Sequence, residues 1–346
     1  MKPRIVRTLT LEPVCGRARF TDCDDLLEGV LSILRGWKVK HLPASPRLAA
    51  TMRVKRTRRG YRRVSPWRSS PSLAREKIRR TVVEAICGFH FELIDWYLRD
   101  RPDELCVHGA AALFKPGLIV FPAVQRVGKS MLTVDLARRG IPIYCDDVLP
   151  VDIASREGIA LGMLPRLRPP LPSDASSALH AYVEAHRGPG YRNRLYVAVP
   201  DDVMVPYGAR SPIAGVVLLE RVPGVTASIT AVDPAEALEA IILQNFATEP
   251  PAERVLDTLY DIVSRGLCRR LRYARAEDAA ALLIESFGRP LVPANRPRPA
   301  RRGKRTAHDT PRKPTKSAKS AKPRMSTKRK KPTTRAKPVR RAERRP

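Results

Sequence analysis

Three consecutive residues, Gly128, Lys129 and Ser130, have the types and spacing needed to bind a phosphate. The apolar residues 118–121 before them predict a buried strand, and residues 131–139 after them predict a helix. A loop between a strand and a helix directs backbone N–H groups at phosphate oxygens, while the lysine adds a positive charge and the serine hydroxyl reaches Mg²⁺. The pattern therefore predicts a site for ATP and Mg²⁺.

The predicted loop departs from the usual G-x-x-x-x-G-K-[ST] pattern. Ala123 stands where the first glycine belongs, and Arg126 stands where many such loops carry another glycine. Both changes weaken the motif, because positive φ angles cost residues other than glycine about 1 kcal/mol more. The scarcity of lysine favours a phosphate-binding role for Lys129, since Lys115 and Lys129 are the only lysines between positions 81 and 290. The alternative is an ordinary turn between the strand and the helix. The predicted nucleotide-binding residues are Ala123, Val124, Gln125, Arg126, Val127, Gly128, Lys129, Ser130 and Met131.

Other residues near this motif in the sequence complete a candidate catalytic site. His108 ends a predicted strand, and Asp146 and Asp147 follow the strand after the predicted helix. Carboxylates at such a strand end can hold Mg²⁺ or accept a proton from a hydroxyl. We predict His108, Asp146 and Asp147 as catalytic residues and Ser130 with Asp147 as metal ligands, although the two aspartates could exchange roles. The alternatives are a plain turn for the aspartates and a core position for the histidine.

Two arginines, Arg166 and Arg168, follow a strand-like run and could stabilise a phosphate during transfer. They are equally consistent with an ordinary arginine surface.

Charge divides the chain into regions. Residues 291–346 contain 22 Lys and Arg against two acidic residues, and residues 35–80 contain 16 against one. Residues 81–290 carry a net charge of −4, so the chain's net charge of +31 comes from two appendages. The tail has few large apolar residues and is expected to be disordered. Its charge predicts sequence-independent nucleic-acid binding, with a solubilising extension as the alternative.

The basic segment 35–80 differs from the tail because it contains Trp37, Tyr61 and Trp67. We expect part of it to be ordered against the core. Five arginines surround Gly60, which is consistent with a phosphate-rich or acidic partner and equally with a solvated surface: Arg56, Arg58, Arg59, Arg62 and Arg63.

Cysteines and apolar runs narrow the class of protein. The six cysteines include no C-x-x-C pair, and Cys87, Cys106 and Cys145 lie in apolar stretches typical of small core residues. No apolar run approaches the about 18 residues of a membrane span, and the N-terminus lacks the features of a signal peptide. We therefore expect a cytoplasmic protein without a membrane partner; the sequence does not indicate its oligomeric state.

Strand and helix patterns alternate along residues 81–289. Helical spacing is also present in residues 20–37, whereas residues 81–98 predict a long apolar helix. Asp233, Pro234 and Glu236 predict a helix start, with the helix running to about Phe246. Further strands are predicted at 105–113, 118–121, 141–145, 148–151, 158–163, 213–220 and 269–274, and further helices at 252–265 and 276–287.

The string VHGAAALFKPGLIVFPAVQRVGKSMLTVDLARRGIPIYCDDVLPVD resembles the P-loop core of the HPr kinase/phosphorylase family. The matching motifs are His108-Gly109, Gly128-Lys129-Ser130, Arg139-Gly140 and Asp146-Asp147-Val148. The resemblance covers roughly residues 80–287 and implies an α/β fold related to phosphoenolpyruvate carboxykinase, with a mixed sheet and flanking helices. It also implies ATP, Mg²⁺ and transfer to a serine hydroxyl on a protein or peptide. No counterpart of the family's glycine-rich substrate-binding segment is found near the C-terminus, so HPr is not the expected acceptor.

These observations predict three regions and one activity. A small N-terminal extension would occupy residues 1–80, the kinase-like domain residues 81–289 and the basic tail residues 290–346. The predicted activity is an ATP-dependent phosphotransferase that acts on a hydroxyl of an unidentified protein or peptide. The alternative is a non-catalytic nucleotide-binding protein whose tail binds nucleic acid. ATP turnover would distinguish them.

Overall fold

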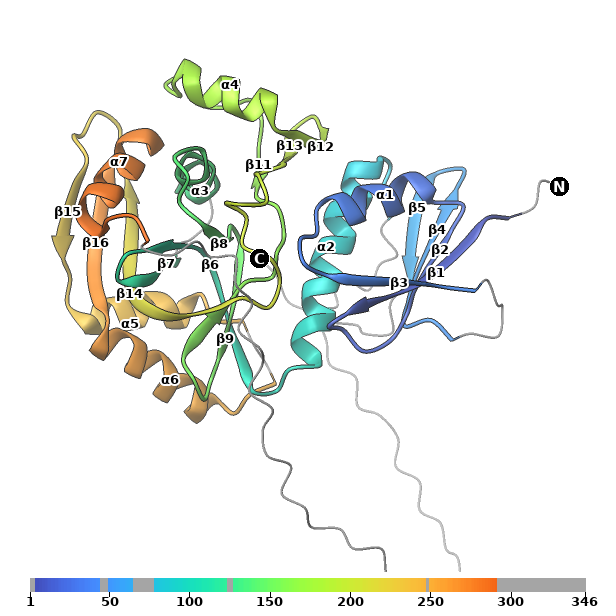
Figure 1. Ribbon diagram of the computed structural model, residues 1–346, viewed down its shortest axis with the longest axis horizontal. Helices are drawn as coiled ribbons and strands as arrows, with labels where there is room; N and C mark the ends of the chain where they lie inside the picture. The colour runs from blue at the N-terminus through green and yellow to red at the C-terminus, as the bar shows by residue number, and fades with distance from the viewer. Residues whose placement is uncertain (1–3, 44–48, 65–77, 123–126, 247–248, 291–346) are drawn as a thin grey trace, which may run out of the picture. The chain divides into compact units, whose positions relative to one another are not determined.

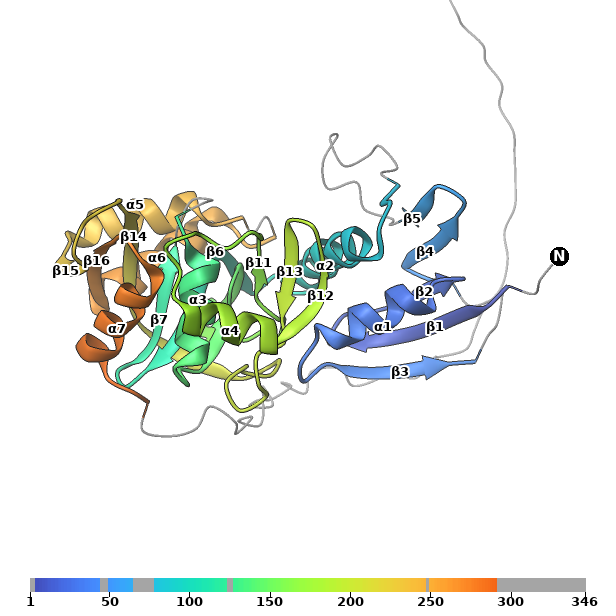
Figure 2. The same ribbon diagram turned by 90° about the horizontal axis from the view of Figure 1, so that it is seen from above.

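The computed structural model describes residues 4–43, 49–64, 78–122, 127–246 and 249–290, which form a mixed α/β structure (Figures 1 and 2). The predicted basic tail beyond Pro290 lies outside the described residues. So do Trp67 and the first four residues of the predicted phosphate-binding loop, Ala123, Val124, Gln125 and Arg126.

The N-terminal part contains a five-stranded sheet that the sequence patterns did not predict. Its strands lie in the order β3-β1-β2-β4-β5, and helices α1 and α2 pack in the same hydrophobic core as its inner residues. The elements are β1 (Val6–Glu12), β2 (Ala18–Thr21), α1 (Asp24–Ser32), β3 (Lys38–Leu42), β4 (Met52–Thr57), β5 (Gly60–Val64) and α2 (Val82–Arg99).

The helix predicted over residues 20–37 is wrong at both ends. Phe20 belongs to β2 and packs against Phe89 of α2, while α1 begins only at Asp24. Asp22 adopts a φ of 56°, which interrupts helical geometry before α1. The basic segment 35–80 is partly ordered, as expected, because Trp37 and Tyr61 are buried and three of its stretches form β3, β4 and β5.

Helix α2 follows the predicted long apolar helix closely. Thr81 is its N-cap: its side chain accepts a hydrogen bond from the Glu84 N–H, and the Glu84 carboxylate accepts one from the Thr81 N–H. This capping box fixes where the helix begins.

The larger sheet contains eight strands. Its strands run in the order β10-β9-β6-β7-β14-β16-β15, with β8 paired to β6. Strand β14 also pairs with β10, so β10, β9, β6, β7 and β14 form a closed circuit. The strands are β6 (Glu104–Phe114), β7 (Gly117–Pro122), β8 (Ile143–Cys145), β9 (Val148–Asp152), β10 (Glu157–Ile159), β14 (Arg210–Arg221), β15 (Ser228–Ala231) and β16 (Leu267–Tyr273).

Helices cover both faces of this sheet, and a separate hydrophobic core lies on each face (Figure 1). Along β7, Ile119 and Phe121 point into the core that contains α3 and α7, whereas Leu118 and Val120 point into the core that contains α5 and α6. Burial on both faces explains why this strand is a continuous apolar run. The helices are α3 (Lys129–Arg138), α5 (Pro234–Leu243), α6 (Ala252–Arg265) and α7 (Ala276–Phe287).

A third, three-stranded sheet follows β10 in the chain. It has the order β11-β13-β12 and was not predicted, because two of its strands are short and Arg- and Gly-rich. Its elements are β11 (Arg166–Leu167), α4 (Ser177–Ala185), β12 (Arg187–Tyr191) and β13 (Arg194–Val197).

Most elements predicted after residue 80 are confirmed. Helices α6 and α7 have the predicted bounds, and α5 begins at the predicted Asp233 cap. Helix α5 ends at Leu243 rather than near Phe246, because Phe246 instead donates its N–H to the Cys106 carbonyl of β6. Cys87, Cys106 and Cys145 are buried, as expected. Of the helices in the described residues, none is long and apolar enough to cross a membrane.

Candidate active site

The carboxyl ends of three parallel strands meet where α3 begins. Strands β7, β14 and β16 are parallel neighbours, and they end at Pro122, Arg221 and Tyr273. The Tyr273 hydroxyl donates a hydrogen bond of 2.6 Å to the carbonyl of Val127, the first described residue after the loop 123–126. The parallel arrangement therefore places side chains from distant parts of the sequence around the predicted phosphate-binding loop.

Gly128 is the N-cap of α3, and its backbone requires glycine. Its φ is 94°, and a Cβ at this position would lie 3.1 Å from the Tyr273 hydroxyl. Lys129 and Ser130 occupy the first turn of the helix, where backbone N–H groups have no partner within the helix. This helix terminus can receive an anion.

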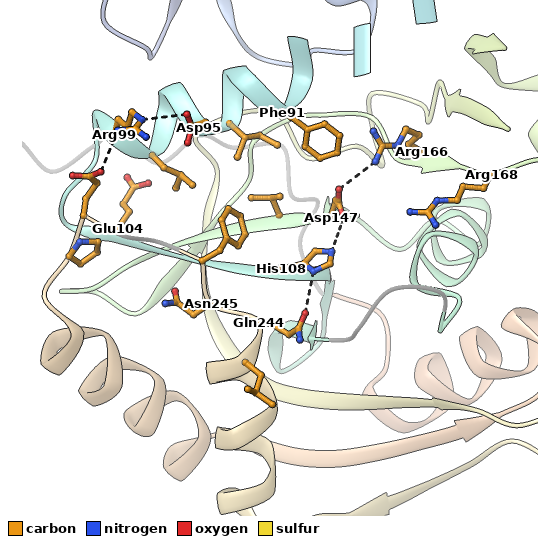
Figure 3. A pocket seen from close by; sticks show the side chains of 17 residues that line it. Phe91, Asp95, Arg99, Glu104, His108, Asp147, Arg166, Arg168, Gln244 and Asn245 are labelled. Atoms are coloured by element: carbon orange, nitrogen blue, oxygen red, sulfur yellow. Dashed lines mark hydrogen bonds and ion pairs between the residues drawn. The ribbon is translucent and has the colours of Figure 1, made fainter. Parts of the chain in front are cut away.

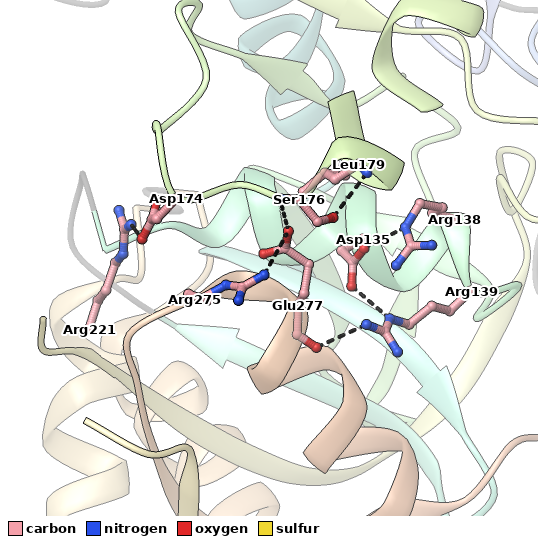
Figure 4. Close-up of polar contacts among 9 residues, drawn as sticks. All are labelled: Asp135, Arg138, Arg139, Asp174, Ser176, Leu179, Arg221, Arg275 and Glu277. Carbon is pink, nitrogen blue, oxygen red and sulfur yellow. Dashed lines mark hydrogen bonds and ion pairs between the residues drawn. The ribbon is translucent and has the colours of Figure 1, made fainter. Parts of the chain in front are cut away.

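Charged residues anchor the far side of α3 (Figure 4). The fully buried carboxylate of Asp135 accepts hydrogen bonds of 2.7 Å from both Arg138 and Arg139. Arg139 also donates to the Glu277 carbonyl of α7, and the Glu277 carboxylate accepts from the backbone N–H of Ser176 at the start of α4. These contacts hold α3 against α7 and α4.

Strand β6 brings His108 to the start of α3. It is antiparallel to β7, with Gly109 opposite Pro122, so the middle of β6 lies beside the carboxyl end of β7. A Cβ on Gly109 would lie 2.8 Å from the Phe121 carbonyl oxygen, so only glycine fits there. The Gly109 N–H donates to the Asp147 carbonyl, which fixes the aspartate pair beside His108.

His108 is in contact with three polar side chains. Its Nε2 lies 3.0 Å from Oδ1 of Asp147 and 3.3 Å from Nζ of Lys129, and its Nδ1 lies 3.2 Å from Oε1 of Gln244. An ionised carboxylate only accepts hydrogen bonds, so Nε2 donates to Asp147 and does not also accept from Lys129. Burial lowers the pKa of Lys129, although the carboxylates of Asp147 and Asp146 oppose the shift.

Asp146 and Asp147 have opposite electrostatic environments. Burial and the neighbouring Asp147 charge raise the pKa of Asp146 to about 6. Burial would also raise the pKa of Asp147, but the hydrogen bond from His108 and the charge of Arg166 outweigh it and hold that pKa at about 2. At neutral pH Asp147 is therefore fully ionised, and Asp146 is close to its titration range.

Asp146, rather than Asp147, is the aspartate that interacts with Ser130. Its Oδ2 accepts a 3.0 Å hydrogen bond from the Arg166 N–H, and a hydrogen bond from Ser130 helps to lower its pKa. Its Oδ1 is buried and has no hydrogen-bond partner within the described part of the chain. A cation beside this oxygen would satisfy it.

These residues line a cleft of about 280 Å³ at the start of α3. A second cavity, of about 460 Å³, adjoins it and is drawn in Figure 3. Four residues line both: His108, Asp147, Arg166 and Arg168. Arg166 approaches Asp147 at 3.7 Å and its guanidinium lies 5.0 Å from the ring centre of Phe91.

The acidic residues fit a magnesium site of the kind that is completed by phosphates. Within the described residues, no group of three or more His, Cys, Asp or Glu side chains could hold a metal ion. Mg²⁺ at nucleotide sites commonly takes only one or two protein ligands, with phosphate and water oxygens as the others. Ser130 and the unsatisfied oxygen of Asp146 match that donor set.

All but one of the predicted site residues that the structure describes are brought together; Val127 is not part of the cleft lining, and its carbonyl accepts the hydrogen bond from Tyr273. His108, Gly128, Lys129, Ser130, Met131, Asp146 and Asp147 all line the one cleft. The predicted metal pair was Ser130 with Asp147. In the structure Asp147 is hydrogen-bonded to His108, and the hydrogen bond from Ser130 acts on Asp146 instead.

The sequence patterns missed three residues of the site. Arg221 lines the cleft, Tyr273 holds the Val127 carbonyl, and Gln244 contacts His108. The ends of the apolar strands β14 and β16 were a usable signal for Arg221 and Tyr273, but only if those strands were known to be parallel to β7.

No protein-family model matches this chain, and comparison with curated proteins finds no significant match.

Proposed function

We propose that this chain is an ATP-dependent phosphotransferase that transfers the γ-phosphoryl group to a hydroxyl of a protein or peptide. The observation that carries the proposal is the meeting of Lys129, Ser130, His108, Asp146 and Asp147 in one cleft, although they come from three separate segments. A positive charge, a helix terminus and two carboxylates are the parts that phosphoryl transfer requires. The resemblance to HPr kinases supports the same class and, with it, a P-loop kinase core of the phosphoenolpyruvate carboxykinase type.

In this proposal, the chain binds the phosphates through α3 and the arginines. The N–H groups at the start of α3 and the Lys129 ammonium bind the β- and γ-phosphates. Arg221 and Arg168 line the same cleft and can neutralise further phosphate charge. Movement of the Lys129 ammonium toward a phosphate leaves the hydrogen bond between His108 and Asp147 intact.

The two aspartates take different roles. Asp147 and His108 line both cavities, so they can orient the acceptor hydroxyl and take its proton. A carboxylate with a pKa of about 2 is a weak base, but a loose phosphoryl transition state needs little proton abstraction before bond formation. As the P–O bond to ADP breaks and the P–O bond to the acceptor forms, the hydroxyl proton passes to the Asp147–His108 pair.

Ser130 and Asp146 would hold Mg²⁺, which when bound neutralises the developing charge on the phosphate oxygens. Arg166 then positions both aspartates, because its backbone N–H donates to Asp146 and its side chain approaches Asp147.

Paired substitutions test the proposal. Lys129→Ala should weaken Mg-ATP binding by about tenfold to a hundredfold in isothermal titration calorimetry, because a charged hydrogen bond to phosphate is lost. Lys115→Ala is the matched control, because Lys115 is exposed and is the only other lysine between positions 81 and 290.

Asp147→Asn should keep Mg-ATP binding while slowing the rate of ADP formation by about a hundredfold or more. Equal ATP affinity in the wild type and Lys129→Ala, or no ATP turnover by the wild type, would reject a kinase.

A further inference from the structure

The larger cavity has the position of an acceptor site. It measures about 460 Å³ and meets the phosphate cleft at His108 and Asp147. One wall is a single face of α2, with lining residues three and four positions apart: Phe91, Ile94, Asp95, Leu98 and Arg99. A molecule in this cavity would reach the proposed γ-phosphate position with one end only.

The opposite wall sets the length of the cavity. Glu104 and His108 both line it, and they lie on the same face of β6 because they are four positions apart in the strand. At about 3.4 Å per residue, this spacing corresponds to roughly 14 Å. The segment from Gln244 runs beside β6, with the His108 N–H donating to the Gln244 carbonyl and the Phe246 N–H to the Cys106 carbonyl.

Large apolar side chains around the cavity are unusually exposed. Phe91, Leu243 and Phe246 are 51%, 71% and 42% exposed, and all three line this cavity. Apolar residues gathered at a pocket and left open to solvent are typical of an interaction site. Since Leu243 stays mostly open at the rim, the occupant extends beyond the cavity, which favours a polypeptide over a small molecule.

The two ends of the cavity have opposite charge. Figure 3 shows His108, Asp147, Arg166 and Arg168 at one end and Asp95, Arg99 and Glu104 at the other. Glu249 also lines the acidic end, where Arg99 lies 3.4 Å from Asp95 and 4.0 Å from Glu249.

Acids still outnumber bases at that end. Even when Arg101, 3.8 Å from Glu104, is counted with Arg99, there are three acidic side chains and two basic ones. Asn245 adds a buried Oδ1 that has no hydrogen-bond partner in the described residues. The Tyr97 hydroxyl already donates to Glu104, but the excess of negative charge and the unsatisfied Asn245 oxygen suit this end to a cationic group.

We propose that this cavity binds an extended peptide segment of the acceptor, with a Ser or Thr at the Asp147–His108 end and a Lys or Arg about four residues away at the acidic end. Extended chain rises about 3.3 Å per residue, so four residues span the distance between His108 and Glu104. Apolar residues between them cover Phe91, Leu243 and Phe246. The inference rests on the proposed function for the transfer step: the bond between the γ-phosphorus of ATP and the bridging oxygen breaks and releases ADP, the phosphorus bonds to the Ser or Thr oxygen, and the hydroxyl proton passes to the Asp147–His108 pair.

Blocked synthetic peptides test the inference with the full chain. Binding of Ser-Leu-Ala-Leu-Lys and Lys-Leu-Ala-Leu-Ser is measured by fluorescence anisotropy, and phosphate incorporation with Mg-ATP by mass spectrometry. Each peptide is compared with the same peptide carrying glutamate in place of lysine. At least one lysine peptide should bind about tenfold more tightly than its glutamate version, because the glutamate lies beside the acidic side chains of the cavity. Aminohexanol serves as a small-molecule acceptor with the same end groups.

Two variants with matched controls locate the site. Glu249→Lys should weaken binding of the lysine peptide by about tenfold or more and abolish its advantage over the glutamate peptide. Glu239→Lys, an exposed charge reversal on α5 outside the cavity, should have no effect. Leu243→Ser should weaken binding by about tenfold, whereas Leu256→Ser, at another exposed leucine, in α6, should not.

The outcomes separate the inference from the proposed function. Lysine-dependent binding without phosphorylation would reject the kinase and keep the cavity as a peptide-binding site. Phosphorylation that is indifferent to the lysine and to Glu249→Lys would overturn the inference and keep the kinase. Phosphorylation of aminohexanol by a chain that neither binds nor modifies the peptides would overturn the peptide assignment.

Discussion

Asp146 and Asp147 are adjacent in the chain, yet their surroundings drive their pKa values apart. Asp146 is buried beside a like charge, which raises its pKa, and Asp147 is held by His108 and Arg166, which lower its pKa. Such divergence between two neighbouring carboxyls commonly accompanies a division of roles. Here it suits Asp146 to a cation and Asp147 to the acceptor hydroxyl.

Asp146→Asn should stabilise the chain above pH 6 when Mg²⁺ and nucleotide are absent. The folded pKa of Asp146 is raised from 3.8 to about 6, so ionisation opposes folding above pH 6, by up to about 3 kcal/mol. This cost decreases as the pH falls from 6 toward 3.8 and disappears below 3.8, where the carboxyl is mostly neutral in both the folded and unfolded states. Urea unfolding of wild type and Asp146→Asn at pH 8 and at pH 4.5 should therefore show a gap that narrows at the lower pH.

The pH interval isolates this residue from its neighbour. The pKa of Asp147 is lowered to about 2, so the stability that it contributes is lost only as the pH falls below about 4. A variant that is less stable than wild type at both pH values would contradict the assigned environment of Asp146.

At the scale of elements, the site depends on which strands are neighbours. Strands β7, β14 and β16 run parallel, so their carboxyl ends bring Val127, Arg221 and Tyr273 together. Strand β6 runs antiparallel to β7 and adds His108 from the middle of its length. The phosphate cleft and the proposed acceptor cavity therefore meet at one strand of the sheet.

Tyr273→Phe should loosen the end of the phosphate-binding loop. The substitution removes the hydrogen bond to the Val127 carbonyl and keeps the buried ring, so we expect a loss of about 1 kcal/mol in unfolding free energy. Mg-ATP affinity should fall severalfold, because the backbone of Val127 just before α3 would lose the contact that holds it. Tyr144→Phe is a suitable control, because Tyr144 is also buried but lies outside the phosphate cleft. An unchanged ATP affinity in Tyr273→Phe would remove this residue from the site.

Across the whole chain, the excess of basic residues lies in sequence regions other than the one that contains the candidate active site. Residues 291–346 carry 22 Lys and Arg, whereas residues 81–290 have a net charge of −4. Of the five arginines around Gly60, Arg56 forms an ion pair with Asp25 of α1, and Arg63 contacts the Gly88 carbonyl and Glu92 of α2. Part of that cluster therefore has a structural role in the N-terminal sheet.

Truncation near Pro290 should abolish non-specific binding to duplex DNA and leave Mg-ATP binding unchanged. Counterion release predicts that the affinity of the full chain falls steeply between about 50 and 200 mM salt, with log K dropping about 0.9 per phosphate contact for each tenfold rise in salt. Fluorescence anisotropy with labelled DNA measures how truncation and how salt change DNA binding. DNA binding that survives truncation would direct attention to Arg58, Arg59 and Arg62, which are exposed. Loss of ATP binding would place the domain boundary elsewhere.

Local features of this protein could be predicted from the order of its residues. Periodicity and capping residues are local signals, and they predicted α2, α6, α7 and the strand before Gly128 correctly. Residue types and spacing also identified Lys129, Ser130, His108 and the two aspartates as candidates for one site. The five-stranded N-terminal sheet was missed, because its strands mix apolar residues with many charged ones and depend on partners distant in the chain.

How these parts meet could not be predicted, because it depends on contacts between distant segments of the folded chain. Strand direction placed Arg221 and Tyr273 beside the loop, and strand direction arises from long-range pairing that no local pattern encodes. Packing drove the pKa values of the two aspartates apart: burial favours the neutral form of both, but only Asp147 meets the His108 hydrogen bond and the Arg166 charge that outweigh it, and these partners come from distant parts of the chain. The cavity between α2, β6 and the segment after α5 joins residues more than a hundred positions apart, and its opposite charges became visible only when those elements packed together.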